Sequence, residues 1–550
     1  MSGGRPVTVG GDMTARQIEG ELRTVVDVLR AAAVANADVE AFVEPAVGDA
    51  PRRALTFAGW DRAADGVAGL LAASGVGRGS VVCLVLPSCA DYMVCYAAAT
   101  RLGAVTSGVN PRLGAGEVRS ILERTHPVVT VVDDGSPVPG GPAGAVLRRS
   151  EALAAATGPR PPSFPELDPT DPVAVVWTSG TTGLPKGAVF DHFSLRAVAA
   201  GTDPLSHPGD RRLSPLPFAH VGSMTRTWDE IANGVTTVIT PTPWRAGDAI
   251  AVMAAERITV AQGVPTQWAL VLDHPALDTA DLSALRVAGT GAARAPAEQI
   301  AELRRRLGVP VVVRYTSTEA SLGTGTVPGD PDEVVATTVG RPVPGVELGL
   351  VGDDGGPVAD GEVGRVRLRS AAVMRGYWGG PPTAPGADGV VFDRAATRAV
   401  LDGDGWLTTG DFGALDASGN LRLAGRANEL YLRGGYNVYP AEVEAALTAH
   451  PTVAQVAVVG APDPVLGEIG VAFVVPEEGS GPVDEGTVLE ELRALARASL
   501  ADYKAPDRLV VVAALPLTSM LKVDKRALAA PAADAAAAGR PIERREARAS

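Results

Sequence analysis

Short apolar runs and amphipathic segments alternate through the first third of the chain. Three runs have the length and apolar character of buried strands, 81–86, 104–109 and 128–132, and the segments between them, 91–102 and 116–125, read as helices. A strand–helix–strand order places the strands in a parallel sheet that helices cover. The alternation therefore predicts an α/β fold, in which these units form a scaffold.

The chain is too long for a single core, since it has 550 residues, and we expect at least two domains. Its net charge of -14, with no basic cluster in the body of the chain, argues against nucleic acid as a partner. We expect no signal peptide, because residues 1–12 hold no apolar stretch, and no membrane span, because no apolar run reaches about 18 residues. Cys83, Cys89 and Cys95 are odd in number and clustered, which favours reduced core thiols in a cytoplasmic protein.

Hydroxyls, glycines and a lysine are concentrated between Thr178 and Gly187, directly after the apolar run 173–176. Glycines let backbone N–H groups approach an anion, hydroxyls add donors, and the lysine adds charge. The stretch therefore predicts a phosphate-binding loop more readily than a glycine-rich surface turn. It differs from the nucleotide P-loop, because Leu184 and Pro185 separate the last glycine from Lys186 and no hydroxyl follows that lysine.

This pattern, Thr-Ser-Gly-Thr-Thr-Gly-x-Pro-Lys-Gly, resembles the signature loop of the adenylate-forming superfamily, which comprises acyl- and aryl-CoA synthetases, adenylation domains of peptide synthetases, and luciferases. The resemblance implies activation of a carboxylate by ATP, with Mg²⁺, to an acyl-adenylate, followed in most members by transfer to a thiol. It also implies a large N-terminal domain (1–427) of parallel sheets layered with helices and a small mobile α/β lid domain (428–530). The residues implied to bind ATP phosphates are Thr178, Ser179, Gly180, Thr181, Thr182, Gly183 and Lys186.

A proline-rich turn ends at His220, where the superfamily places an aromatic residue or histidine that lines the acyl pocket and the thiol tunnel. His220 is thus a candidate catalytic and substrate-binding residue, with a purely structural histidine as the alternative. Peptide-synthetase domains for α-amino acids carry an aspartate where this chain has Val221. An apolar wall cannot compensate a buried ammonium, so we do not expect an α-amino acid as the substrate. Val221, Gly222, Met224 and Gly289 predict a mainly apolar pocket, suited to a medium-chain, branched or aromatic carboxylate. The other residues expected to line the acyl pocket are Gly222, Met224, Gly289 and Ser317.

Two further strand-to-loop segments resemble the nucleotide site of the superfamily. The loop after 285–289 offers Gly291, Ala292 and Ala293, whose small size suits the approach of adenine and the acyl group, although a tight packing turn is the alternative. In 314–319 the resemblance implies that Tyr315 stacks on adenine, Thr318 donates to the α-phosphate and Glu319 holds Mg²⁺. A carboxylate beside a nucleotide suits magnesium. Arg314 and Thr316 complete this candidate set, and Thr316 stands where glycine is usual.

The motif 404–411 resembles the ribose-binding segment, with Asp411 accepting from the ribose hydroxyls. Arg426 and Asn437 are implied nucleotide contacts. Asn428 takes the hinge position, where Asp or Lys is usual, and asparagine still tolerates unusual backbone angles. Gly434 and Gly435 are implied to let CoA pass close to the backbone.

The last part of the chain predicts a compact α/β domain. We expect helices at 441–449 and 485–499 and strands at 453–459, 471–475 and 508–512. The segment 515–526 resembles the catalytic-lysine motif, with Lys522 as the lysine, Leu521 in place of the usual glycine, and Lys525 out of register. The alanine-rich and then charged sequence from Ala529, including 531–550, is expected to be a mobile tail.

These motifs predict an ATP-dependent, AMP-forming acyl- or aryl-CoA synthetase, an acid–thiol ligase. In this reading Lys522, Glu319 and the phosphate loop, including Thr178, neutralise charge where the carboxylate attacks the α-phosphate. The same motifs occur in free-standing ligases that load a separate acyl carrier protein, which is the alternative function. A nucleotide-binding protein without catalysis is a third possibility, suggested by Thr316, Asn428 and Leu521.

Overall fold

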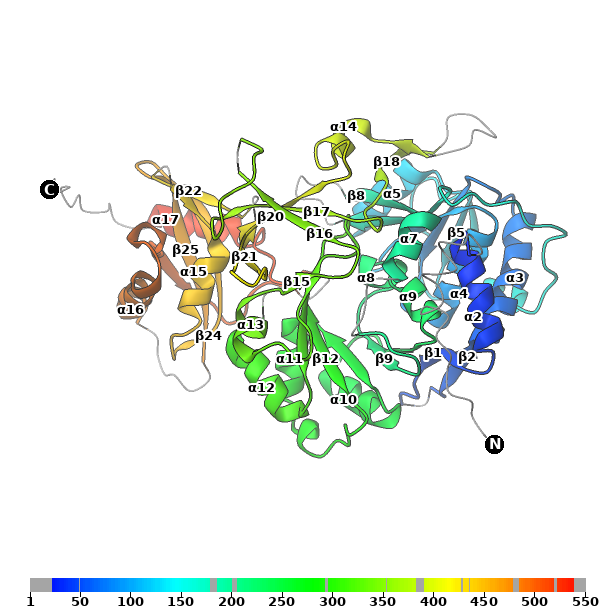
Figure 1. Ribbon diagram of the computed structural model, residues 1–550, viewed down its shortest axis with the longest axis horizontal. Helices are drawn as coiled ribbons and strands as arrows, with labels where there is room; N and C mark the ends of the chain where they lie inside the picture. The colour runs from blue at the N-terminus through cyan, green and yellow to red at the C-terminus, as the bar shows by residue number, and fades with distance from the viewer. Residues whose placement is uncertain are drawn as a thin grey trace. The chain divides into compact units, whose positions relative to one another are not determined.

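The computed structural model divides the chain into two compact units (Figure 1). The first comprises Met1–Val351, Val366–Thr409 and Asp416–Leu421, and the second comprises Gly352–Arg365, Gly410–Leu415 and Arg422–Ser550. The predicted limits of 1–427 and 428–530 stay a prediction. The structure describes residues 22–48, 50–178, 185–199, 205–291, 295–352, 354–381, 390–426, 429–434, 436–477, 484–518 and 522–538.

A nine-stranded sheet in the first unit has the order β15-β14-β13-β12-β11-β9-β10-β1-β2, and its strands from β13 to β1 are parallel. The strands are β1 Glu40–Glu44, β2 Arg53–Thr56, β9 Arg211–Ser214, β10 Thr236–Ile239, β11 Val260–Gly263, β12 Val287–Gly291, β13 Val311–Tyr315, β14 Thr324–Gly325 and β15 Arg341–Pro342. Buried side chains of this sheet pack with α10 (Ala246–Ala255), α11 (Pro265–Leu272) and α12 (Ala297–Leu307), which Figure 1 shows side by side near β12.

An eight-stranded sheet, also in the first unit, has the order β19-β18-β8-β7-β4-β3-β5-β6. Its strands are β3 Val81–Val85, β4 Val105–Gly108, β5 Val129–Val132, β6 Ala145–Arg148, β7 Pro172–Thr178, β8 Lys186–Asp191, β18 Gly376–Gly380 and β19 Val391–Phe392. The strands from β7 to β6 in this order are parallel. Strand β8 pairs antiparallel with β7, and β18 pairs antiparallel with β8.

The predicted parallel sheet is therefore confirmed. The helices of this region are α2 Val25–Ala35, α3 Phe57–Ala73, α4 Ala90–Arg101, α5 Ala115–Thr125, α6 Arg149–Ala155 and α7 His192–Ala199.

Local sequence explains the limits of these helices. Thr24 and Asp27 form a reciprocal capping box at the start of α2. Gly114 donates its N–H to Glu117 Oε2 at 2.8 Å at the start of α5, and His126 ends that helix in a left-handed conformation with φ 42°. Two short helices, α8 (Val221–Met224) and α9 (Thr227–Ala232), follow the proline-rich turn.

A four-stranded sheet, β16-β17-β20-β21, contains the strands in which the chain passes between the two units. Its strands are β16 Glu347–Val351, β17 Gly364–Arg369, β20 Leu407–Leu415 and β21 Leu421–Arg426. The short elements η1 (Pro275–Asp278), α13 (Asp332–Thr337) and α14 (Arg394–Arg398) lie in connections. No helix in the described part of the chain is both long and apolar enough to span a bilayer.

The second unit is built on a sheet in which β23-β22-β25-β24 are consecutive and β26 pairs with β25. Its strands are β22 Tyr431–Arg433, β23 Tyr436–Val438, β24 Val453–Asp463, β25 Gly467–Pro476 and β26 Arg508–Val511. Helices α15 (Pro440–Leu447) and α16 (Glu485–Ser499) share one hydrophobic cluster with it, and η2 (Asp502–Lys504) precedes β26. The expected helices and strands are all present, with β24 and β25 longer than predicted because they pair along their whole length.

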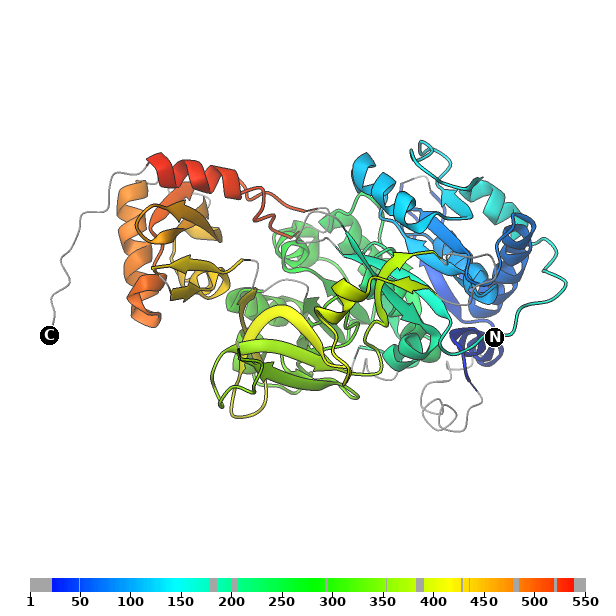
Figure 2. The same ribbon diagram turned by 90° about the horizontal axis from the view of Figure 1, so that it is seen from above.

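The structure differs from the predicted mobile tail over Ala529–Ala538, which form helix α17 (Figure 2). Ala532 is fully buried, and Ala535 and Ala536 pack on the cluster that β24 and β25 present on their other face. Alanine has the highest helix propensity, and its small side chain allows the helix to approach the sheet closely. Residues 539–550 lie outside the described part.

Candidate active site

The signature loop connects the two strands of a β-hairpin. Thr178 at the end of β7 pairs with Lys186 at the start of β8, and Trp177 pairs with Gly187. The ends of the predicted phosphate loop are therefore held together by the sheet. The loop residues Ser179, Gly180, Thr181, Thr182 and Gly183 lie outside the described residues, so their predicted contacts with phosphate stay a prediction.

Lys186 lies over an aromatic ring at the base of this loop. Tyr377 on β18 pairs with Ala188, two residues after Lys186 on the same face of β8. The Lys186 ammonium is 5.3 Å from the centroid of the Tyr377 ring, a cation–π distance. No carboxylate pairs with Lys186 among the described residues, so its charge is available to an anion.

The Tyr377 hydroxyl links this lysine to the predicted metal ligand. It donates a hydrogen bond to Glu319 Oε1 at 2.8 Å, and the backbone N–H of Met374 donates to the Glu319 carbonyl at 2.8 Å. Burial and the adjacent Glu319 carboxylate raise the pKa of Tyr377, so the hydroxyl stays protonated and remains a donor. Tyr377 thus belongs to the candidate site, although the sequence alone predicts no role for it.

Arg124 holds the β8 end of the loop, where Pro185 precedes Lys186. The guanidinium at the end of α5 donates to the Pro185 carbonyl and lies 5.0 Å from the centroid of the Trp177 ring. The Trp378 indole in turn donates to the Arg124 carbonyl at 2.9 Å. Arg124 was not expected at the site, because it is far from every motif in sequence.

The segment after β13 carries the predicted nucleotide residues. Arg314 pairs in register with Gly291 of β12, which brings the two predicted loops to the same edge of the sheet. Tyr315 is buried at 7% exposure, Thr316 is exposed, and Ser317 accepts from the Ala320 N–H at 3.2 Å. Gly291 and Gly289 lie on β12, whereas Ala292 and Ala293 fall outside the described residues. Thr318 and Glu319 are half-buried beside them.

His220 caps the short helix α8. Its Nδ1 accepts from the Gly222 N–H at 3.1 Å, so a neutral imidazole carries its proton on Nε2. Val221 is 4% exposed and Met224 is fully buried, with its sulfur near the position that a Cβ on Gly108 would take. Four of the predicted acyl-pocket residues, His220, Val221, Gly222 and Met224, thus lie on one helical turn, whereas Gly289 lies on β12 and Ser317 follows β13. The part of all six in binding an acid stays a prediction.

Three residues of the second unit come together as the motifs predict. Arg426 Nε donates to Asp411 Oδ1 at 2.8 Å, and Asp411 is buried at 6% exposure. Lys522 lies within electrostatic reach of both. Burial, with a smaller contribution from Arg426 and against the opposing effect of Asp411, lowers the pKa of Lys522 from 10.5 to about 8. An ammonium with a reduced pKa remains cationic at neutral pH.

Two hydrogen bonds between Thr518 and Lys522 close the loop that carries Lys522. The Thr518 N–H donates to the Lys522 carbonyl at 2.7 Å, and the Lys522 N–H donates to Thr518 Oγ1 at 3.3 Å. Leu521 lies outside the described residues. Lys525, the out-of-register alternative, is held between Glu429 at 2.9 Å and Glu444 at 2.7 Å. That double ion pair gives Lys525 a structural role, and the catalytic role of Lys522 stays a prediction.

The predicted CoA and hinge residues are only partly described. Gly434 has φ +59°, a left-handed conformation that favours glycine, in the turn between β22 and β23. The backbone of Asn437 pairs with Leu432 in that hairpin. Asn428 and Gly435 lie outside the described residues, so the hinge and CoA assignments stay predictions.

Glu319 fits a magnesium ligand by its chemistry. One carboxylate oxygen accepts from Tyr377, and Oε2 has no hydrogen-bond partner among the described residues. Magnesium binds through one or two carboxylates together with phosphate oxygens, and Lys186 marks the expected phosphate side. Glu319 would then supply one ligand and Tyr377 would orient it.

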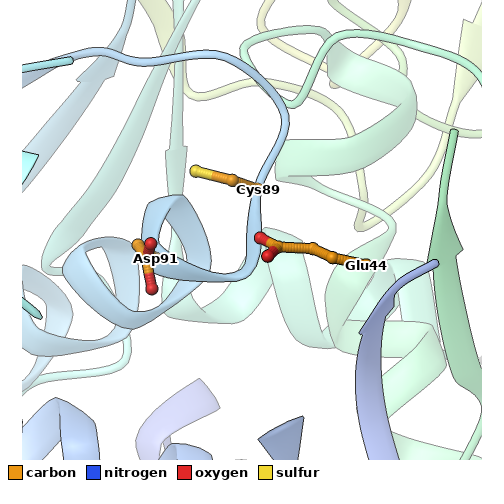
Figure 3. A group of neighbouring side chains, drawn as sticks. All are labelled: Glu44, Cys89 and Asp91. Atoms are coloured by element: carbon orange, nitrogen blue, oxygen red, sulfur yellow. The ribbon is translucent and has the colours of Figure 1, made fainter. Parts of the chain in front are cut away.

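A second group of potential metal ligands is an ion-pair network instead. Glu44, Cys89 and Asp91 bring ligand atoms within 4.8 Å of one another (Figure 3). Arg53 pairs with Glu44 at 2.8 Å and with Asp91 at 2.7 Å, and Arg149 donates to Asp91 at 2.7 Å. Burial raises the pKa of Cys89 to about 12, whereas a metal needs a thiolate. The three cysteines are buried free thiols, as predicted.

Comparison with known proteins identifies the class. The family described as AMP-binding enzyme matches residues 29–378, and its C-terminal domain matches residues 442–522. The chain belongs to the AMP-binding enzyme family. The predicted superfamily, the adenylate-forming enzymes, is therefore confirmed, and so is the prediction of an acid–thiol ligase among its acyl- and aryl-CoA synthetases.

Individual relatives are named as CoA ligases or CoA synthases. The indoleacetate–CoA ligase of Aromatoleum aromaticum is 35% identical over 495 residues, covering 86% of this chain and 92% of the relative. The feruloyl-CoA synthase of an Amycolatopsis species is 33% identical over 479 residues, covering 86% and 93%. A solved anthranilate CoA ligase in complex with anthranoyl-AMP superposes with a TM-score of 0.81 at 26% identity, covering 94% of this chain and 98% of the other.

Proposed function

We propose that this protein activates an apolar medium-chain or aromatic carboxylic acid with Mg·ATP and transfers the acyl group to CoA. The observation that carries the proposal is the arrangement of Lys186, Tyr377 and Glu319 at the base of the signature loop. Within the described residues it provides a cation, Lys186, without a carboxylate partner and, next to it, the Glu319 carboxylate with one oxygen that accepts no hydrogen bond. Mg·ATP needs both kinds of group.

In the first half-reaction, the acid carboxylate attacks the α-phosphate and pyrophosphate leaves. This step brings two anions together, so preorganised positive charge is the main requirement. Lys186 in the first unit and Lys522 in the second supply ammonium groups, and Asp411 with Arg426 supplies the ribose contacts. No side chain has to remove a proton, because the carboxylate is already ionised.

The second half-reaction is attack of the CoA thiol on the adenylate carbonyl, with AMP as the leaving group. Relatives named for indoleacetate, ferulate and fatty acids support an apolar acid and CoA as the acceptor. The buried side chains of Val221 and Met224 support the same substrate class. We propose that Asn428 is the hinge and that Gly434 and Gly435 flank the path of the thiol.

An acid-panel assay tests this function. AMP release is measured with ATP and Mg²⁺, with and without CoA, on the wild type and on Lys522→Ala. We expect CoA-dependent turnover on an apolar acid and a loss of about 10² to 10³ in rate for the variant. Lys525→Ala is the matched control, because its ion pairs place it outside the chemistry.

Two other outcomes of this assay would favour the alternative functions. A single turnover of pyrophosphate release that CoA does not extend indicates a carrier protein as the acceptor. ATP binding without pyrophosphate release on any acid indicates a nucleotide-binding protein and contradicts the proposal.

A further inference from the structure

The helical segment 221–232 presents one accessible face. Thr225 and Arg226 join α8 to α9 with right-handed helical backbone angles. From Val221 to Asn233 every residue is buried except Gly222, Arg226 and Asn233. Spacings of four and seven residues place these three on one side of an α-helix. Arg226 therefore lies one turn beyond Gly222, a predicted acyl-pocket residue, on the same face.

Arg226 is a cation with two buried donor atoms that lack hydrogen-bond partners in the described part of the chain. Its side chain is only 16% exposed, and its Nε and Nη2 atoms are buried with no hydrogen-bond partner among the described residues. The nearest carboxylate oxygen, Asp229 Oδ2, is 3.8 Å from Nε, beyond hydrogen-bond distance. A buried donor of a charged group that remains unsatisfied is costly, so proteins seldom keep one without a use.

The neighbouring carboxylates are occupied by other donors. Glu230 accepts from Arg212 at 2.7 Å and from Thr237 at 2.7 Å. Asp229 accepts from Ser206 and, at 2.9 Å, from Asn233. The carboxylates of Asp229 and Glu230 thus lie near the guanidinium groups of Arg212 and Arg226. Arg314 adds a further positive charge. Burial, Arg212 and Arg314 lower the pKa of Arg226 to about 9, against Asp229 and Glu230.

The position of Arg226 relates it to the predicted acyl site. Helical side chains lean toward the N-terminus of their helix, so Arg226 extends toward the turn that contains Gly222, where Leu216 and His220 are the nearest side chains. On its other side, Arg314 is close enough to affect its pKa, and Arg314 pairs in register with Gly291 at the end of β12. The guanidinium is thus bordered by elements that carry predicted acyl-site residues.

We propose that Arg226 is a specificity residue that binds a second oxygen acceptor of the acid substrate, at the end remote from the carboxylate that is activated. The inference rests on the proposed function and narrows it: the substrate has an apolar body and carries a distal carbonyl, phenolic or carboxylate oxygen. Such an oxygen supplies the acceptor that Nε and Nη2 lack. An acid without it leaves the guanidinium desolvated and unpaired, which a site of this kind rejects strongly.

Two matched acid series test the proposal. One is heptanoate, 6-oxoheptanoate and heptanedioate; the other is 3-phenylpropanoate with hydrogen, hydroxy, acetyl or carboxy at the para position. The kcat/KM for acid-dependent pyrophosphate release is measured for each. For the wild type we expect an oxygen-bearing acid to exceed its unsubstituted partner by at least about 100-fold in one series. The oxo and carboxy members distinguish a neutral acceptor from an anion.

Arg226→Met, which keeps the length of the side chain and removes the donors, should reduce that ratio to less than about fivefold. Arg304→Met is the matched control. The Arg304 side chain, on helix α12, is 18% exposed and is paired with Asp332. Arg226→Lys should retain a preference for the dicarboxylate only, since it keeps the charge and loses the planar donors. Should Arg226→Met fold poorly, the lysine variant provides the test.

A wild type that turns over the unsubstituted acids equally well, or a preference that survives in Arg226→Met, would overturn the proposal and leave the ligase function standing. Absence of acid-dependent pyrophosphate release with every acid would overturn the ligase function and this inference with it. Thermal unfolding of Arg226→Met without substrate gives an independent readout. We expect a melting temperature equal to or above that of the wild type, because an unpaired buried charge is removed. A marked fall in melting temperature, with an unchanged kcat/KM ratio between oxygen-bearing and unsubstituted acids, would make Arg226 a structural partner of Asp229.

Discussion

Removing one hydroxyl at the base of the signature loop should weaken the use of Mg·ATP. In Tyr377→Phe the ring remains under Lys186, and only the hydrogen bond to Glu319 is lost. A hydrogen bond to a charged group contributes about 1.5–3 kcal/mol, and each 1.36 kcal/mol corresponds to a factor of ten in rate. Partners that orient a metal ligand typically contribute a factor of about 10 to 100. We therefore expect kcat/KM for Mg·ATP to fall by about 10- to 100-fold.

Acid-dependent exchange of labelled pyrophosphate into ATP isolates the first half-reaction. The exchange is measured over a range of Mg²⁺ concentrations, and the deficit of Tyr377→Phe should shrink as Mg²⁺ rises, because the metal then compensates a less ordered ligand. Tyr503→Phe is the control, since the Tyr503 hydroxyl makes no hydrogen bond within the described residues. In Glu319→Gln the same substitution of Tyr377 should have little additional effect, because the two residues act as a pair.

The reasoning is refuted if Tyr377→Phe exchanges pyrophosphate within about threefold of the wild type at every Mg²⁺ concentration. Additive effects of Tyr377→Phe and Glu319→Gln would also refute it, since they would show that the hydroxyl acts on something other than Glu319.

Three further outcomes follow from the same structure. Because the pKa of Lys522 is lowered to about 8 and its cation is the active form, the rate of pyrophosphate exchange should be constant below about pH 7 and fall tenfold per pH unit well above pH 8. Lys522→Arg should remove that fall. A wild-type rate that stays constant to about pH 10 would contradict the prediction. Arg124→Ala should raise KM for ATP by about tenfold, because the Pro185 carbonyl loses its donor, and an unchanged KM would show that the loop needs no such anchor. Ala532→Asp should lower the melting temperature of the second unit by several degrees, because it places a carboxylate in an apolar contact, whereas the exposed Ala530→Asp should not.

The scaffold could be predicted from the sequence because its signals are local. The strands between 81 and 132 are short and completely buried, two of them as mainly apolar runs, and helix α5 between the last two starts at Gly114 and ends at His126 in a left-handed conformation. Helix α17 was missed for the opposite reason. A run of alanines has no amphipathic pattern, so composition suggested a mobile tail, and only the apolar face of β24 and β25 selects Ala532 for burial.

The candidate site could be predicted in its motifs and not in its long-range contacts. Asp411, Arg426 and Lys522 were found because each lies in a recognisable motif, and the structure places them in one unit within electrostatic reach. Tyr377 meets Glu319 across 58 residues of sequence, since β18 pairs with β8. That pairing depends on the whole sheet, so no local pattern indicates it.

Arg226 shows a different limit. Its spacing of four residues from Gly222 can be read from the sequence, and by itself it suggests only a charged residue on a solvated helix face. Arg226 becomes informative because its Nε and Nη2 atoms have no hydrogen-bond partner within the part of the chain that the structure describes, while other donors already occupy Asp229 and Glu230. A missing interaction has no sequence signal, because it depends on the positions of all the groups that fail to reach the arginine. Substrate specificity in an apolar pocket is set by such unsatisfied groups, so the structure can narrow the class of acid where the motifs, shared by acyl- and aryl-CoA synthetases alike, cannot.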